Sequence, residues 1–67
     1  MTMRFLRLQD VMSLTGLGRS TIYKFMADEV FPKTIPLGGR AVGWLESEIE
    51  EWMEQRLALR DNQESFQ

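Results

Sequence analysis

Five polar side chains close together in the segment RSTIYK have the chemistry to contact an anionic partner. Arg19 and Lys24 can donate to phosphate oxygens or to guanine acceptors, and Tyr23 can donate its hydroxyl to a nucleic-acid backbone. Ser20 and Thr21 can donate to phosphate where a helix begins, because free backbone N–H groups there also favour an anion. These residues predict a contact surface for double-stranded DNA. The alternative is an ordinary helix face that meets only water, so the surrounding elements must decide.

A glycine-containing turn precedes this segment and joins it to another short helix. Residues 8–14 carry apolar side chains at the spacing of one helix face, and Gly16 suits a left-handed helix end onto which Leu17 packs back. Gly18 is a tolerable N-cap for a second helix that starts near Arg19. The apolar stripes are Leu8, Val11 and Met12 in the first helix and Ile22, Phe25 and Met26 in the second. Such a unit is typical of a helix-turn-helix, whose second helix enters the major groove.

A hairpin with a basic tip is predicted after the second helix. The two prolines of the chain exclude a helix here, and Pro36 would suit only an edge strand. Residues 34–37 and 41–44 flank a Gly-Gly-Arg sequence whose glycines allow the positive φ of a tight turn. As a wing beside the duplex, this ribbon would contact DNA through Lys33 and Arg40, with Arg40 along or in the minor groove. A solubilising charge at a turn tip is the alternative.

Two more arginines, Arg4 and Arg7, lie before the first helix. They could add phosphate contacts to those of the helix and the wing. They could equally pair with acidic side chains of this chain, and the sequence favours neither possibility.

The last predicted helix, residues 46–60, is acidic in its first half. The sequence gives the first residue of this helix only to within about two positions, because Ser47 with Glu50 could form a capping box slightly later in the chain. The glutamates come early and Arg56 and Arg60 late, an order that complements the helix dipole. Paired carboxylates can do acid–base or metal chemistry, but nothing else converges on these. A solvated helix face is therefore the prediction for them.

The composition limits the functions open to the chain. Its 67 residues make one small domain, predicted over residues 1–60, with a polar tail at residues 61–67 that we expect to fray. Trp44 and Trp52 are predicted to lie in the core rather than to stack on bases. The chain has no cysteine and no histidine, so we expect no catalysis, no cofactor, no metal and no small-molecule ligand. No apolar run could span a membrane and the start lacks the features of a signal peptide, so the expected location is the cytoplasm.

Charge is distributed unevenly along the chain, whose net charge is −2. Residues 1–43 carry six basic and three acidic side chains, whereas residues 44–67 carry two basic and seven acidic ones. The first part therefore has a net charge of +3 and the second a net charge of −5. An anionic partner would be attracted to the first part and repelled by the second.

The segments RFLRLQDV, TGLGRSTIYKFM and FPKTIPLGGRAVGWLESEIEEWMEQR together resemble the AlpA family of small phage-related DNA-binding regulators. The resemblance covers about residues 4–56 and implies a compact relative of MerR-type winged helix-turn-helix proteins and of phage excisionases. By position, residues 19–26 would be the core of the recognition helix and residues 38–42 the wing. Gly18 departs from the family, which commonly has a capping serine there. The glycine should weaken the cap by only a few tenths of a kcal/mol, although it lacks any phosphate contact that a serine would make.

The sequence thus predicts a mainly α-helical winged helix-turn-helix, in the order helix, turn, helix, hairpin and helix, that binds double-stranded DNA and regulates transcription. The resemblance implies a prophage-related regulator of integrase or excision genes. One alternative is an architectural excisionase that bends attachment-site DNA, and another is an adaptor that recruits a basic protein to the acidic helix. Because one such unit buries on the order of 600–1,000 Å² against DNA, we expect a homodimer or cooperative binding at adjacent sites.

Overall fold

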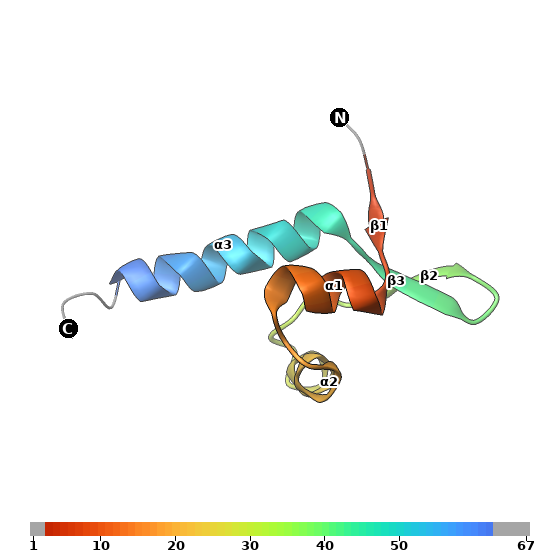
Figure 1. The fold of residues 1–67 in the computed structure, drawn as a ribbon, viewed down its shortest axis with the longest axis horizontal. Helices are drawn as coiled ribbons and strands as arrows, with labels where there is room; N and C mark the ends of the chain where they lie inside the picture. The colour runs from red at the N-terminus through yellow and green to blue at the C-terminus, as the bar shows by residue number, and fades with distance from the viewer. Residues whose placement is uncertain (1–2, 63–67) are drawn as a thin grey trace.

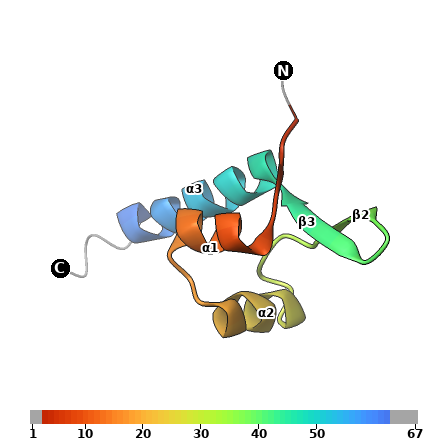
Figure 2. The same cartoon turned by 45° about the vertical axis from the view of Figure 1, so that its right-hand side comes forward.

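The computed structural model describes residues 3–62 as three helices and three short strands (Figure 1). Along the chain they are β1 (Phe5–Leu6), α1 (Leu8–Thr15), α2 (Arg19–Ala27), β2 (Ile35–Gly38), β3 (Ala41–Leu45) and α3 (Glu46–Asn62). In two views α1 lies between α3 and α2, and the β2–β3 hairpin projects from one end of the molecule (Figures 1 and 2). The predicted order of helix, turn, helix, hairpin and helix is confirmed.

The turn between α1 and α2 forms because its first glycine adopts a left-handed conformation. Gly16 ends α1 with a φ of 75°, and its N–H donates to the Met12 carbonyl oxygen over 2.8 Å. Leu17 is partly buried against the core, as the sequence predicted. Gly18, in extended conformation, is the N-cap of α2 and supplies no side-chain hydrogen bond to it. The helix-turn-helix is therefore present, with a weak cap at the start of its second helix.

A small core lies where the helices meet the sheet. Its buried side chains are Leu6, Val11, Ile22, Phe31, Trp44 and Ile49. Trp44 is 1% exposed, and its Nε1 donates to the Pro32 carbonyl oxygen at 3.0 Å. Trp52 is partly buried edge-on against Phe31, and its Nε1 donates to the Val30 carbonyl oxygen at 2.7 Å. The two tryptophans thus hold the loop between α2 and β2. The predicted place of Trp44 in the core is confirmed, whereas Trp52 packs against the core and stays partly exposed.

The sheet has three antiparallel strands in the order β1-β3-β2, where the sequence predicted a ribbon of two. The additional strand, β1, has only two residues and pairs with the last two residues of β3. A strand of two residues is too short to show an alternating pattern of apolar and polar residues, so the sequence could not predict it. Only its pairing with β3 identifies it as a strand. β2 is an edge strand, as Pro36 requires, and the hairpin turn uses positive φ values at Gly38 and Gly39.

α3 follows β3 directly, and the N–H of Glu46 donates to the Arg4 carbonyl oxygen at 2.8 Å. The helix ends at Asn62, so the first two residues of the predicted tail are helical, and residues 63–67 lie outside the described residues. Every residue from 54 to 62 is exposed. None of the helices within residues 3–62 is both long and apolar enough to cross a membrane.

Candidate nucleic-acid interface

α2 turns its apolar side chains inward and its polar side chains to the surface. Ile22 is fully buried, and Phe25 and Met26 are partly buried against the core. Of the predicted contacts, Arg19, Ser20, Tyr23 and Lys24 are exposed and Thr21 is half-buried. The first backbone N–H groups of α2 also have no side-chain acceptor from its N-cap. The helix therefore offers several donors on one side.

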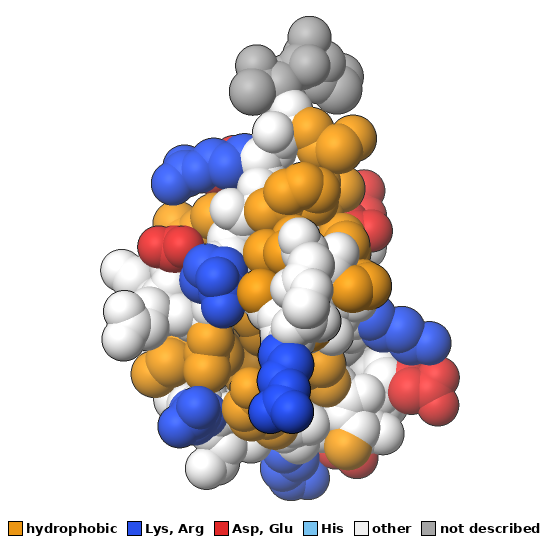
Figure 3. Space-filling model, turned by 90° about the vertical axis from the view of Figure 1, so that its right-hand side faces the viewer, with side chains coloured by type: hydrophobic (Ala, Val, Ile, Leu, Met, Phe, Trp, Pro, Cys, Tyr) orange, Lys and Arg blue, Asp and Glu red, His pale blue; other side chains and the backbone are white. Residues whose placement is uncertain are grey.

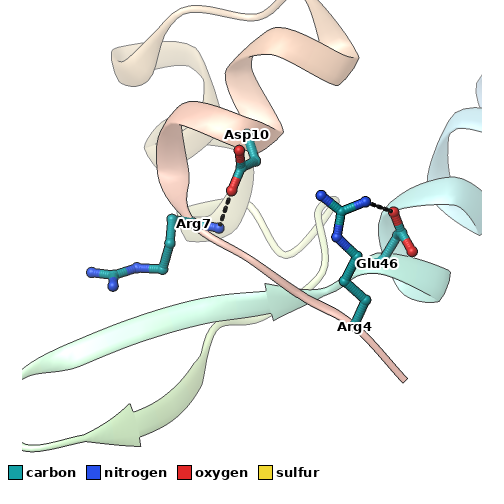
Figure 4. A network of polar contacts seen from close by, with 4 residues as sticks. All are labelled: Arg4, Arg7, Asp10 and Glu46. Carbon is teal, nitrogen blue, oxygen red and sulfur yellow. Dashed lines mark hydrogen bonds and ion pairs between the residues drawn. The ribbon is translucent and has the colours of Figure 1, made fainter. Parts of the chain in front are cut away.

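A hollow between the start of α1, the outer side of α2 and β3 brings side chains of these elements together. Its lining is Arg7, Leu8, Gln9, Asp10, Arg19, Tyr23, Val42 and Trp44. We call it the basic hollow, because it has two guanidinium groups and one carboxylate. That carboxylate, of Asp10, accepts the backbone N–H of Arg7 at 3.0 Å and so closes the first turn of α1. The side chain of Arg7 points away from Asp10 (Figure 4) and makes no salt bridge within residues 3–62.

Of the eight residues that line the basic hollow, only Arg7, Arg19 and Tyr23 were predicted as contacts. Leu8 and Trp44 were predicted as apolar packing residues, and Val42 only as part of the wing. Gln9 is exposed in the first turn of α1, and nothing in the sequence marks it. Val42 is 42% exposed and lies two residues before the buried Trp44 in β3. Because alternate residues of a strand share a face, this spacing could have placed Val42 beside Trp44.

The tip of the hairpin presents a cation to solvent. Arg40 is exposed in the turn between β2 and β3, after Gly38 and Gly39 with φ values of 132° and 55°. Arg40 makes no salt bridge with any other residue in the described part of the chain. Figure 3, which looks onto the hairpin end, shows Lys and Arg side chains around a strip of hydrophobic ones, with acidic side chains toward the margins. This end of the molecule is suited to a polyanion.

Lys33, the other predicted wing contact, lies in different surroundings. It lines a hollow between the loop before β2 and α3, and the carboxylates of Glu29, Glu48 and Glu51 line the same hollow. We call it the acidic hollow, because its lining has three carboxylates and one amine. Lys33 and Arg19 therefore line different hollows, and an anion near Lys33 would also meet carboxylates.

Arg4 is engaged within the chain. Its Nη1 donates to Oε2 of Glu46 at 3.0 Å, which ties the N-terminal segment to α3 (Figure 4). The two side chains are 63% and 28% exposed, so solvent limits the strength of the pair. Of the two possibilities left open for the N-terminal arginines, Arg4 takes the pairing with an acid, whereas Arg7 lies in the basic hollow.

Lys24 also has a partner within the chain, one helical turn away. Its Nζ lies 3.3 Å from Oδ2 of Asp28, and both side chains are largely exposed. Exposed pairs at this spacing in a helix contribute about 0.3–0.5 kcal/mol. So weak a pair leaves the ammonium group able to turn to a more highly charged ligand.

The carboxylates of α3 do not converge on a site. Glu48, Glu50, Glu51 and Glu54 are all exposed. Within residues 3–62 no group of three or more His, Cys, Asp or Glu side chains could hold a metal ion. The prediction of a solvated face fits Glu50 and Glu54, whereas Glu46 pairs with Arg4 and Glu48 and Glu51 line the acidic hollow.

Two short helices joined by a glycine turn and followed by a hairpin define the winged helix-turn-helix class of protein. Residues 4–57 match the model of the family described as prophage CP4-57 regulatory protein (AlpA), and the chain belongs to this AlpA family. The family is one of regulators rather than of enzymes, as the sequence predicted.

Two relatives show how far the similarity extends. Over 62 residues the chain is 45% identical to the DNA-binding transcriptional activator AlpA of Escherichia coli K12, a match that covers 84% of this chain and 89% of that protein. Over 57 residues it is 51% identical to the uncharacterized protein ORF88 of Enterobacteria phage P4, which covers 85% of this chain. The chain spans 65% of the length of the phage protein.

Proposed function

We propose that this chain is a transcriptional regulator that binds double-stranded DNA with α2 in the major groove. The observation that carries the proposal is the basic hollow, because it joins Arg19 and Tyr23 of α2 to Arg7 at the start of α1. Cationic and hydroxyl donors from two helices can thus reach one stretch of phosphate backbone while α2 meets base edges.

The remaining contacts follow from this placement of α2. Ser20 and Thr21, in its first turn, are within reach of a phosphate that the backbone N–H groups also attract. Lys24 extends the donor row toward the end of the helix, and Arg40 would lie along or in the neighbouring minor groove. Lys33 is the weakest of the proposed contacts, because of the carboxylates around it.

The arrangement of the helices also favours a DNA ligand on the α2 side. In both views α1 separates α2 from α3, the helix that carries most of the acidic side chains (Figures 1 and 2). A duplex bound to α2 would therefore be held away from the glutamates of α3. This separation removes much of the repulsion that the net charge of −2 would suggest.

We further propose that the regulated genes belong to a prophage and include integrase or excision functions. Support comes from the family description, from the E. coli relative named as a transcriptional activator and from the phage P4 relative. The same helix and wing would serve an excisionase. An excision assay with an integrase on promoter-free DNA separates the two roles, because stimulation there would indicate the architectural one.

The decisive experiment selects bound sequences from a random DNA pool and measures their affinity at several salt concentrations. We expect Lys24→Ala and Arg40→Ala to weaken binding, and each to lower the slope of log affinity against log salt by about one phosphate contact. If both variants bind the selected site like the parent chain at every salt concentration, the proposal is wrong. If the parent chain shifts no DNA even at low salt, an adaptor role for the acidic helix becomes the better account.

A further inference from the structure

The second half of α3 lies outside the packed body of the molecule. Trp52 and Met53 are the last α3 residues that pack against the core, and every residue from 54 to 62 is exposed. In both views no other helix or strand lies alongside this end of α3 (Figures 1 and 2). Leu57 and Leu59 there are 48% and 46% exposed. Leu57 and Leu59 lie about 200° apart around the helix, so a single partner helix can cover only one of them.

Four side chains form a stripe along α3: Glu50, Met53, Leu57 and Arg60. Their spacing of three, four and three residues is that of the seam between two paired helices. The stripe is acidic at one end, apolar in the middle and basic at the other end. Within residues 3–62 Glu50 is in no salt bridge, and Arg60 pairs only with its exposed neighbour Asp61, at 3.0 Å.

We propose that two copies of this chain pair through the stripe, with their α3 helices antiparallel. An antiparallel pair centred on residue 55 sets Glu50 opposite the partner's Arg60 and Met53 opposite the partner's Leu57, so the stripe is complementary to itself. A parallel pair would set Glu50 against Glu50 and Arg60 against Arg60, and like charges repel. The order of charges along α3 therefore selects the antiparallel arrangement.

The flanks of the stripe do not strengthen the pairing. Glu54 and Arg56 lie about 200° apart around α3, so they border the stripe on opposite sides, and the two-fold axis brings each toward its own counterpart in the partner. Arg56 also has a contact within its own chain, because its guanidinium carbon lies 5.7 Å from the ring centre of Trp52. The apolar part of the stripe is short, so we expect weak association of the free protein, with a dissociation constant on the order of 100 μM.

Sedimentation equilibrium of the full chain without DNA tests the pairing through its charges. We expect Glu50→Lys and Arg60→Glu each to weaken the dimer about tenfold, and the double variant to restore it. Glu51→Lys is the matched control, because residue 51 lies about 100° around the helix from residue 50. A parent chain that stays monomeric at millimolar concentration would overturn the proposal, as would a control that weakens the dimer equally or a double variant that stays weak.

Cross-linking tests the direction of the helices, and it is simple because the chain has no cysteine. When Met53→Cys and Leu57→Cys chains are mixed and oxidised, we expect the mixed disulfide to exceed either like pair several-fold. An excess of like pairs would indicate parallel helices and overturn the proposal. Because Met53 packs against the core, Glu50→Cys with Arg60→Cys provides a second mixed pair should the first variant fail to fold.

The antiparallel dimer has a two-fold axis, which gives a consequence for DNA that rests on the proposed function. Two α2 helices related by this axis would bind inverted half-sites, as two-fold symmetric regulators do. The two proposals fail separately. A chain that dimerises but shifts no DNA retains the helix pairing, whereas a monomer that binds a single asymmetric site retains only DNA binding.

Discussion

Both hollows of the molecule are lined by basic and acidic side chains, but basic ones are in excess in one and acidic ones in the other. The basic hollow has Arg7 and Arg19 against Asp10, whose carboxylate is occupied by a backbone N–H. The acidic hollow has one amine, that of Lys33, among three carboxylates from the loop before β2 and from α3. Exposed cations occur in both. Only in the basic hollow would a phosphate find cations without a surplus of carboxylates.

The difference shows that the neighbours of a basic residue, and not its exposure, decide whether it suits an anion. Lys33 and Arg19 are both exposed and both belong to residues 1–43, which have a net charge of +3. At ionic strengths near 0.15 M a charge acts over about 8 Å, so the side chains lining one hollow dominate its potential. Variants of the strand packing, of the basic side chains and of the start of α2 test this difference between the two hollows.

The largest effect is expected from Gly43→Ala, which would break the scaffold of both hollows. An added Cβ would lie 2.6 Å from the Leu6 carbonyl oxygen and 2.9 Å from Cδ1 of Leu37. Because the closest atom is backbone, β1 and β3 must separate, and we expect a loss of about 1–3 kcal/mol in the free energy of unfolding. Urea denaturation checks this. A variant as stable as the parent chain would contradict the close approach of β1 to β3.

The next effect contrasts the cations of the two hollows. We expect Arg19→Ala to lower affinity for the selected DNA on the order of tenfold and to reduce the salt slope by about one. Lys33→Ala should have less than about a third of that effect on log affinity, because carboxylates already offset its charge. Mobility shifts of both variants across salt concentrations provide the test. Equal losses would show that the contact with the duplex extends beyond the basic hollow to Lys33.

A smaller effect separates the two N-terminal arginines. Arg7→Ala should weaken DNA binding by about one phosphate contact and leave the unfolding midpoint unchanged. Arg4→Ala should leave binding nearly unchanged and lower stability by at most about 1 kcal/mol, through loss of an exposed pair with Glu46. Parallel binding and denaturation curves of the two variants decide this. The reverse pattern would mean that Arg4 leaves Glu46 when DNA binds.

The smallest effect concerns the start of α2, where Gly18 supplies no side-chain cap. Gly18→Ser adds a hydroxyl that can accept a backbone N–H of the first turn, and no atom lies within 4 Å of the added Cβ. We expect a gain of a few tenths of a kcal/mol in unfolding free energy, seen as a higher urea midpoint with the same slope. A lower midpoint would show that the serine does not cap α2. An accompanying rise in DNA affinity would identify a phosphate contact made by the new hydroxyl.

The sequence by itself determined the order of the three helices and the hairpin and most of their boundaries, but not β1. Gly16 ended the first helix, the apolar stripe around Ile22 gave the inward side of α2, and Gly38 with Gly39 gave the hairpin turn. Each of these features depends on residues only a few positions apart. Such local features can be predicted from backbone preferences and from the helical period of the sequence.

Only the tertiary structure decided which charges share a surface and which strand completes the sheet. β1 exists because β3 pairs with it, and Arg4 meets Glu46 across 42 positions of sequence. The grouping of Arg7 with Arg19, and of Lys33 with carboxylates, depends on how helices and hairpin pack around Trp44 and its neighbours. Periodicity gives the face on which a side chain lies. The period does not show which residues of another element lie opposite that side chain, because only the packing of the core brings the elements together.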